Sequence, residues 1–228
     1  MSIARRHFLR VTAELEAKKA QASASAELAA PATGSLADQM QAKLAEHIRA
    51  LKAVQSVAAK VAMKREFLPD YAAYVDGVLA AGVGAQDPVV VTVLIWLLDI
   101  GDYDRALDIA SYAIEHKLAS PDNFSRSLPC AVLEEIADAT LDRLKAKEGC
   151  ADMAPTLELA MELVDGQDMP DEVPAKAHKA LGLIHESTDP ARSVTHLESA
   201  LKLDPKIGVG QVLSRAKKAA EALSQART

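Results

Sequence analysis

The stretch VVVTVLIWLLDIGDYDRALDIASYAIEH, residues 89–116, decides the fold because it contains a complete helix–turn–helix pattern. Its first part is apolar on every side, as in a buried helix. Gly101 and Asp102 then interrupt the pattern, and the second part carries apolar residues at helical spacing. Before it, Asp87 and Pro88 are typical of a helix start, since aspartate accepts hydrogen bonds from free N–H groups and proline fits the first turn. The segment predicts a helical hairpin.

The rest of the chain extends this pattern. Aromatic residues make up only 4%, and Gly and Pro fall between periodic segments rather than inside them. No stretch alternates apolar and polar residues with β-branched enrichment, so no strand is predicted. A second hairpin is predicted over residues 172–203. Both hairpins resemble tetratricopeptide-type repeats, in which small residues let paired helices approach closely. The predicted fold class is all-α.

Charge and composition divide the chain into four predicted parts. Residues 1–34 combine a basic helix with a flexible linker, and residues 35–66 form one long amphipathic helix able to enter a coiled coil. Residues 67–206 form an acidic helical-repeat body with 11 Lys and Arg against 25 Asp and Glu, a net charge of −14. Residues 207–228 form a basic C-terminal helix and tail. An acidic body repels nucleic acid, so DNA contacts are expected at the ends.

Four aspartates near the only tryptophan, Trp96, raise the question of a metal site. A metal-dependent nuclease needs carboxylates that converge on one point, whereas Asp99, Asp102, Asp104 and Asp108 follow one another along the chain. We interpret Asp102 as the N-cap of the second helix. Asp104 and Asp108 fit a solvated helix face. Asp99 lies at a helix C-terminus, where the helix dipole disfavours it, and the sequence offers no reason for it.

Other residues with metal-binding chemistry are interpreted as structural. His178 and His185 lie two turns apart on one helix, about 10 Å, which is too far for one zinc ion. His178 and His196 are expected to pack between helices. A row of acidic residues on one helix face keeps open the alternative of a metal-dependent nuclease. These residues are Glu135, Asp138 and Asp142. Without a GxxxxGK[ST] loop or paired-acid motif, no catalytic residue, metal ligand or cofactor is predicted.

The location of the protein is predicted from three further features. Cys130 and Cys150 form no zinc-binding or disulfide pattern, as is usual in a reducing compartment. The longest apolar run, residues 89–98, has about half the length needed to span a bilayer. An export signal needs an apolar stretch after the twin-arginine segment ARRHFLR at 4–10, but the following VTAELEAKKAQ carries four charges, which does not fit. We therefore expect a cytoplasmic protein without membrane contact.

Three motifs occur in a familiar order: GAQD at 84–87, DIGD at 99–102 and DMPDEV at 168–173. With KREFLP at 64–69, they resemble the small terminase subunit family of temperate tailed phages and prophages. The resemblance covers most of residues 36–210. It implies a DNA-packaging role in the cytoplasm of the bacterial host. The subunit would recognise the packaging site on double-stranded viral DNA, form a homo-oligomer and deliver DNA to a large subunit that carries the ATPase and nuclease. Family members are often labelled endonuclease subunits, which we interpret as a description of the holoenzyme.

Two sets of residues are the predicted binding sites. Basic residues in the first 66 positions are DNA candidates, because Lys and Arg neutralise phosphates and release counterions. They are Arg5, Arg6, Arg10, Lys18 and Lys19, followed by Lys60, Lys64 and Arg65. Apolar residues along 36–61 are candidates for oligomerisation, with packing onto the hairpins as the alternative. They are Leu36, Met40, Leu44, Ile48, Leu51, Val54 and Val61. A helical-repeat scaffold without direct DNA contact is also compatible with the acidic middle.

Overall fold

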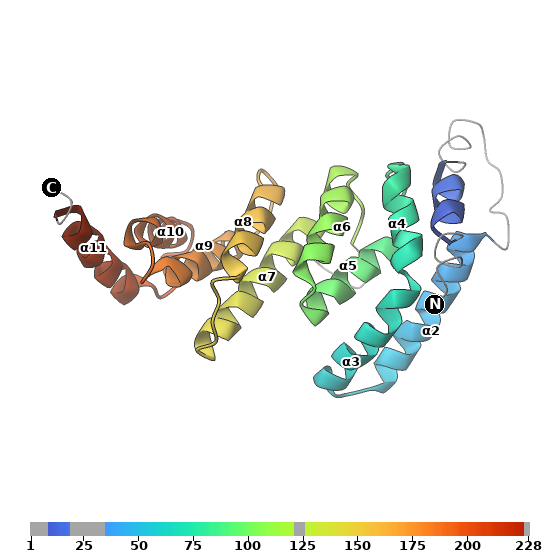
Figure 1. The fold of residues 1–228 in the computed structure, drawn as a ribbon, viewed down its shortest axis with the longest axis horizontal. Coiled ribbons are helices and arrows are strands. Elements are labelled where there is room, and N and C mark those ends of the chain that lie inside the picture. Colours follow the sequence, from blue (N-terminus) through green and yellow to red (C-terminus); the bar gives the residue numbers. More distant parts are fainter. Residues whose placement is uncertain (1–8, 19–34, 121–125, 226–228) are drawn as a thin grey trace. The chain divides into compact units, whose positions relative to one another are not determined.

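The computed structural model describes residues 9–18, 35–120 and 126–225 (Figure 1). Every regular element in these ranges is a helix, which confirms the predicted all-α class. The chain separates into two compact units, Met1–Leu128 (unit 1) and Pro129–Thr228 (unit 2). The boundary between them lies inside the predicted acidic body. Within the described ranges, no helix is both long and apolar enough to cross a membrane.

Unit 1 is organised around one predominantly apolar helix. Residues 9–18 are helical, and the labelled elements follow in chain order. These are α2 (Leu36–Ala53), α3 (Val57–Phe67), the 3₁₀ helix η1 (Leu68–Asp70), α4 (Ala72–Ala81), α5 (Pro88–Ile100) and α6 (Tyr103–Glu115). Eight residues of α5 are buried, among them Val89, Leu94 and Trp96. Helix α6 is amphipathic and packs its apolar side on α5, as the hairpin pattern predicts.

The long helix expected over residues 35–66 is two helices, and the prediction of a continuous helix is wrong. The backbone at Val54 is extended, with φ −99° and ψ 134°, which ends α2. Ser56 then caps α3 by accepting a hydrogen bond from the Ala59 N–H. Ser35 starts α2 with a capping box that it forms together with Asp38. A β-branched residue two positions before a capping serine is the local signal for the break.

The helix at residues 9–18 is anchored to the rest of unit 1. A Cβ added to Gly77 of α4 would lie 2.3 Å from the Arg10 carbonyl oxygen and 2.7 Å from the Ala13 Cβ. The two backbones therefore approach as closely as only glycine permits. The Glu16 carboxylate accepts from the Leu36 N–H at 3.0 and 3.2 Å, so it joins this helix to the N-terminus of α2. The predicted linker at 23–34 lies outside the described residues.

Unit 2 continues the helical pairs with smaller side chains at the contacts. Its elements are α7 (Leu128–Lys145), which begins at the unit boundary, α8 (Met153–Leu163), α9 (Glu172–His185), α10 (Pro190–Leu203) and α11 (Gly210–Gln225). Gly182 of α9 lies against Leu197 of α10, because an added Cβ would meet the Leu197 side chain at 2.5 Å. The hairpins α5–α6 and α9–α10 are thus confirmed as helical pairs. Their tetratricopeptide character stays a prediction.

Candidate functional site: an arginine-rimmed pocket in unit 1

The pocket forms where η1 turns the chain between α3 and α4. Pro69 is the second residue of this 3₁₀ turn, and a proline near the start of a helix has no N–H to leave unpaired. The C-terminal end of α3 lies beside the C-terminal end of α5. There Lys64 makes an ion pair with Asp99, and its side chain is only 15% exposed. This cation explains why Asp99 is tolerated at the negative end of a helix dipole.

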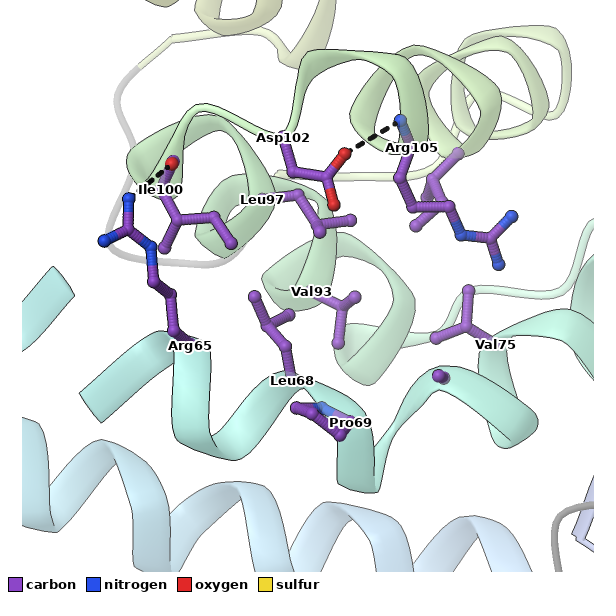
Figure 2. Close-up of a pocket in the computed structure, with 11 residues that line it drawn as sticks. Arg65, Leu68, Pro69, Val75, Val93, Leu97, Ile100, Asp102 and Arg105 are labelled. Atoms are coloured by element: carbon purple, nitrogen blue, oxygen red, sulfur yellow. Dashed lines mark hydrogen bonds between the residues drawn. The ribbon is translucent and has the colours of Figure 1, made fainter. Parts of the chain in front are cut away.

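The floor and walls of the pocket are apolar. It has a volume of about 280 Å³ and is lined by side chains from α3, η1, α4, α5 and α6. Figure 2 shows Leu68, Val93 and Leu97 pointing toward the same space. Val75 and Ile109 complete the floor and are almost fully buried. At the mouth, Pro69 and Ala72 are exposed, so an apolar group from outside can reach the floor.

Charged groups at the mouth have different partners. Arg65 donates one hydrogen bond to the Ile100 carbonyl oxygen at 3.1 Å (Figure 2), a favourable place for a cation because it is a helix C-terminus. Arg105 is paired with Asp76 of α4. Asp102 caps α6 by accepting from the Arg105 N–H at 3.4 Å, which confirms its predicted role. Arg65 is therefore the cation of the pocket mouth with no carboxylate partner among the described contacts.

The loop before α5 holds the neighbouring helices rigidly. Asp87 accepts from the Val89 and Val90 N–H groups, as the sequence predicts, and also from the Tyr74 hydroxyl at 2.6 Å. Burial, and then the Asp87 charge, raise the pKa of Tyr74 far above its ordinary value. The Gln86 amide donates to the Lys117 carbonyl and accepts from the Ala119 N–H. The GAQD motif thus fixes the α4–α5 loop to the end of α6.

The predicted DNA-binding residues are not gathered at one described surface. Arg5, Arg6 and Lys19 lie outside the described residues. Arg10 is exposed on the anchored helix, and Lys18 is paired with Glu14 at 2.6 Å. Lys60 is half-buried on α3. Lys64 and Arg65 serve the contact between α3 and α5, and Arg65 also reaches the pocket mouth.

The predicted oligomerisation residues fall into two groups. Four of them are buried within unit 1, as the alternative of packing onto the hairpins predicts. These four are Leu36, Met40, Leu44 and Leu51. Ile48, Val54 and Val61 are half-buried. The part of the stripe that is accessible to a partner is thus shorter than the sequence suggests, and its role in oligomerisation stays a prediction.

The residues behind the nuclease alternative are engaged in contacts within unit 2. Lys176 of α9 donates to Glu134 at 3.1 Å and to Asp138 at 2.9 Å. Across the described ranges, no three His, Cys, Asp or Glu side chains come together as metal ligands would. The His178 and His196 rings meet between α9 and α10 with their Nδ1 atoms 3.0 Å apart, which confirms the predicted packing. Burial lowers the pKa of His178, and burial with the neighbouring histidines lowers that of His196 to about 4.

Comparison with known proteins identifies the class. The profile of the phage small terminase subunit family matches residues 41–172, more than half of the chain and the whole of the pocket. The "Terminase, endonuclease subunit" of Escherichia phage P2 is 39% identical over 215 residues, which is 94% of this chain and 83% of that protein. The "Probable terminase, endonuclease subunit" of Haemophilus phage HP1 is 32% identical over 102 residues, 44% of this chain and 36% of that protein. No solved structure gives a significant match.

The chain belongs to the phage small terminase subunit family, and it is a subunit of a phage DNA-packaging terminase. Sequence reasoning reached the family but missed the pocket. Several rim residues lie in the motifs KREFLP and DIGD. These motifs come together only through contacts between positions 35 residues apart. The sequence signal for this meeting was Asp99, whose carboxylate at a helix C-terminus is unfavourable without a cation nearby.

Proposed function

We propose that the protein recognises the packaging site on double-stranded viral DNA and joins the large terminase subunit, which carries the ATPase and nuclease. The work takes place in the cytoplasm of the bacterial host. The observation that carries the proposal is the 39% identity to the phage P2 terminase subunit over 94% of the chain. The word endonuclease in that name belongs to the phage P2 protein. We assign cleavage to the large subunit, because Lys176 forms an ion pair with Asp138, one of the acidic residues on which the nuclease alternative depends.

The basic N-terminal residues are the proposed DNA contacts. Residues 1–66 carry 11 Lys and Arg against 6 Asp and Glu, whereas residues 67–206 have a net charge of −14. A polyanion is attracted to the first region and repelled by the second. Arg10 supports this assignment because it is exposed on a helix that Gly77 and Glu16 anchor to unit 1.

A binding assay with two duplexes tests the DNA proposal. The full chain is titrated with a duplex that carries the phage end region and with a scrambled duplex, across a salt series. We expect a preference for the end region and a steep loss of affinity with salt. Changing Arg5, Arg6 and Arg10→Gln together reduces the slope of log affinity against log salt by about 0.9 for each phosphate contact that is lost.

A matched triple variant in unit 2 serves as the control. Lys145, Lys202 and Lys206→Gln removes three exposed cations as well, and we expect it to leave the slope unchanged. Equal slopes for both triple variants and the wild type would overturn the assignment of DNA contacts to Arg5, Arg6 and Arg10. No binding of the wild type to either duplex at low salt would replace the DNA proposal with a protein–protein scaffold.

Homo-oligomerisation is the third part of the proposal. Ile48, Val54 and Val61 are only half-buried, and Val57 is 75% exposed at the turn between α2 and α3. Covering these side chains with a second chain would remove apolar area from water, which favours association. Light-scattering mass measurements over a concentration series test this part, and a mass of one chain throughout would contradict it.

A further inference from the structure

The lining and volume of the pocket in unit 1 limit which chemical groups can bind there. A cavity of about 150 Å³ holds one benzene ring. At about 280 Å³, the pocket takes a leucine-sized side chain together with part of its neighbour. The floor formed by Val75, Val93 and Leu97 offers such a group only apolar contacts. At the mouth, Arg65 has N–H donors left for a carboxylate beside that group.

DNA is a poor occupant for this pocket. A phosphate gains nothing from an apolar floor. The occupant is therefore better sought among protein side chains. An apolar anchor in a pocket, with charged groups around it, is the usual arrangement at the centre of a protein interface.

The same chain presents a matching group. Four large apolar side chains are strongly exposed among the described residues: Leu15, Val57, Leu159 and Leu223. Leu159, on α8, is 52% exposed. Glu162 is exposed three residues later on the same helix, so it shares a face with Leu159.

The other three exposed side chains have unsuitable surroundings. Val57 lies among Lys52 and Lys60, which would face the arginines of the mouth. Leu223 is on α11, whose charges are mostly basic. Leu15 shares its helix with Arg10 and Lys18. Of these four side chains, Leu159 is the one that shares a helix face with a carboxylate, Glu162, that has no partner among the described contacts.

We propose that Leu159 of one copy of the chain inserts into the arginine-rimmed pocket of a second copy, with Glu162 paired to Arg65. The two surfaces differ, so the contact is heterologous, and repetition closes a ring or extends a filament. Each copy then uses its pocket for one neighbour and its α8 face for the other. This inference rests on the homo-oligomer part of the proposed function and names its interface.

Mass measurements on full-length variants test the insertion. Ala72→Trp places an indole at the exposed mouth of the pocket, and Ala80→Trp adds the same group to an exposed position of α4 that does not line it. We expect Ala72→Trp and Leu159→Gln to weaken self-association by tenfold or more, and Ala80→Trp to leave it unchanged. Circular dichroism confirms that each variant is folded.

A charge exchange tests the ion pair. Arg65→Glu and Glu162→Arg are each expected to weaken association several-fold, and the double variant to recover most of it. Recovery is specific to a direct pairing, since two unrelated defects would add. A chain with Ala72→Cys mixed with a chain with Leu159→Cys should give a two-chain product with a short thiol cross-linker, and Ala80→Cys should not.

Several outcomes would overturn the inference. If the wild type has the mass of a single chain at all concentrations, the inference is wrong. DNA binding and large-subunit binding are measured separately and can still support the other parts of the proposed function. Unchanged association in Ala72→Trp would exclude the pocket. Loss of large-subunit or DNA binding in Ala72→Trp, with association intact, would assign the pocket to that partner instead.

Discussion

The interiors of the two units differ in the side chains that form them. Unit 1 is held by α5, whose buried residues are all apolar and which packs against the aromatic rings of Phe67 and Tyr71 through Trp96. Unit 2 places polar groups between its helices. Ser193 donates to the Gly182 carbonyl at 2.7 Å, and Lys176 joins α7 to α9. Apolar burial stabilises both units, whereas the buried polar side chains among the described residues, Glu134, Thr140 and Ser193, all lie in unit 2.

The largest effect is expected in the apolar interior. Leu94→Ala removes a fully buried side chain from α5 and should cost about 2–5 kcal/mol, the usual penalty for a cavity of this kind. Trp96 is the only tryptophan, so its fluorescence reports the unfolding of unit 1 alone. Ser111→Ala, on the exposed side of α6, is the control and should change little. A cost below that of the control would contradict a core centred on α5.

Unit 2 should be most sensitive to added volume. Gly182→Ala brings a methyl group to about 2.5 Å from the Leu197 side chain, and overpacking of this kind costs about 1–3 kcal/mol. Gly149→Ala is the matched control, because nothing lies within 4 Å of its added Cβ. Hydrogen exchange of α9 and α10 measures the effect. Equal exchange in both variants would show that the helices are not in close contact there.

A smaller effect is expected where the loop before α5 is fixed. Asp87→Ala removes the N-cap of α5, a loss of about 1 kcal/mol, and leaves the Tyr74 hydroxyl without its acceptor. The melting temperature followed by Trp96 fluorescence should fall. Ser111→Ala, on the exposed side of α6, serves again as the control and should not lower it. Equal melting temperatures would mean that the cap is dispensable.

The last effect is a pH dependence of the stability of unit 2. The pKa of His196 is lowered to about 4 by burial, by His178 and His185 of α9 and by Arg192 of α10, against an opposing effect of Glu158 of α8. Between this value and the ordinary pKa of about 6.5, the unfolded chain binds more protons than the folded one. The stability of unit 2 is thus full above pH 6.5 and decreases as the pH falls.

Hydrogen exchange at pH 7.5 and 5.5 checks this, after correction for the intrinsic exchange rates. Protection of α9 and α10 should decrease more than that of α5. In His196→Gln the difference between the two pH values should shrink. An undiminished difference in that variant would assign the effect to another group.

The sequence could predict contacts that are local and could not predict those that join distant positions. Asp87, Asp102 and Asp189 act as caps because each serves N–H groups two or three residues away. The N-terminus of α2 has a second acceptor besides its capping box, the Glu16 carboxylate. Glu16 lies 20 residues earlier, and no sequence periodicity predicts this hydrogen bond.

The candidate site shows the same limit. Lys64 and Arg65 are predicted as DNA contacts, and the sequence does not show that their partners within the chain lie at Asp99 and Ile100, 35 residues away. A narrow apolar stripe on residues 36–61 also cannot reveal whether it faces a partner or the same chain. Here Leu36, Met40, Leu44 and Leu51 are covered by unit 1 itself.

The most direct test of the account is whether this protein brings viral DNA to the large terminase subunit. Immobilised large subunit is mixed with labelled end-region or scrambled duplex, with and without the full chain, at near-physiological salt. The account predicts that the end-region duplex is retained only when the chain is present, and that Arg5, Arg6 and Arg10→Gln together abolish the retention. Equal retention without the chain, or of both duplexes with it, would contradict a role in recognising and delivering the packaging site.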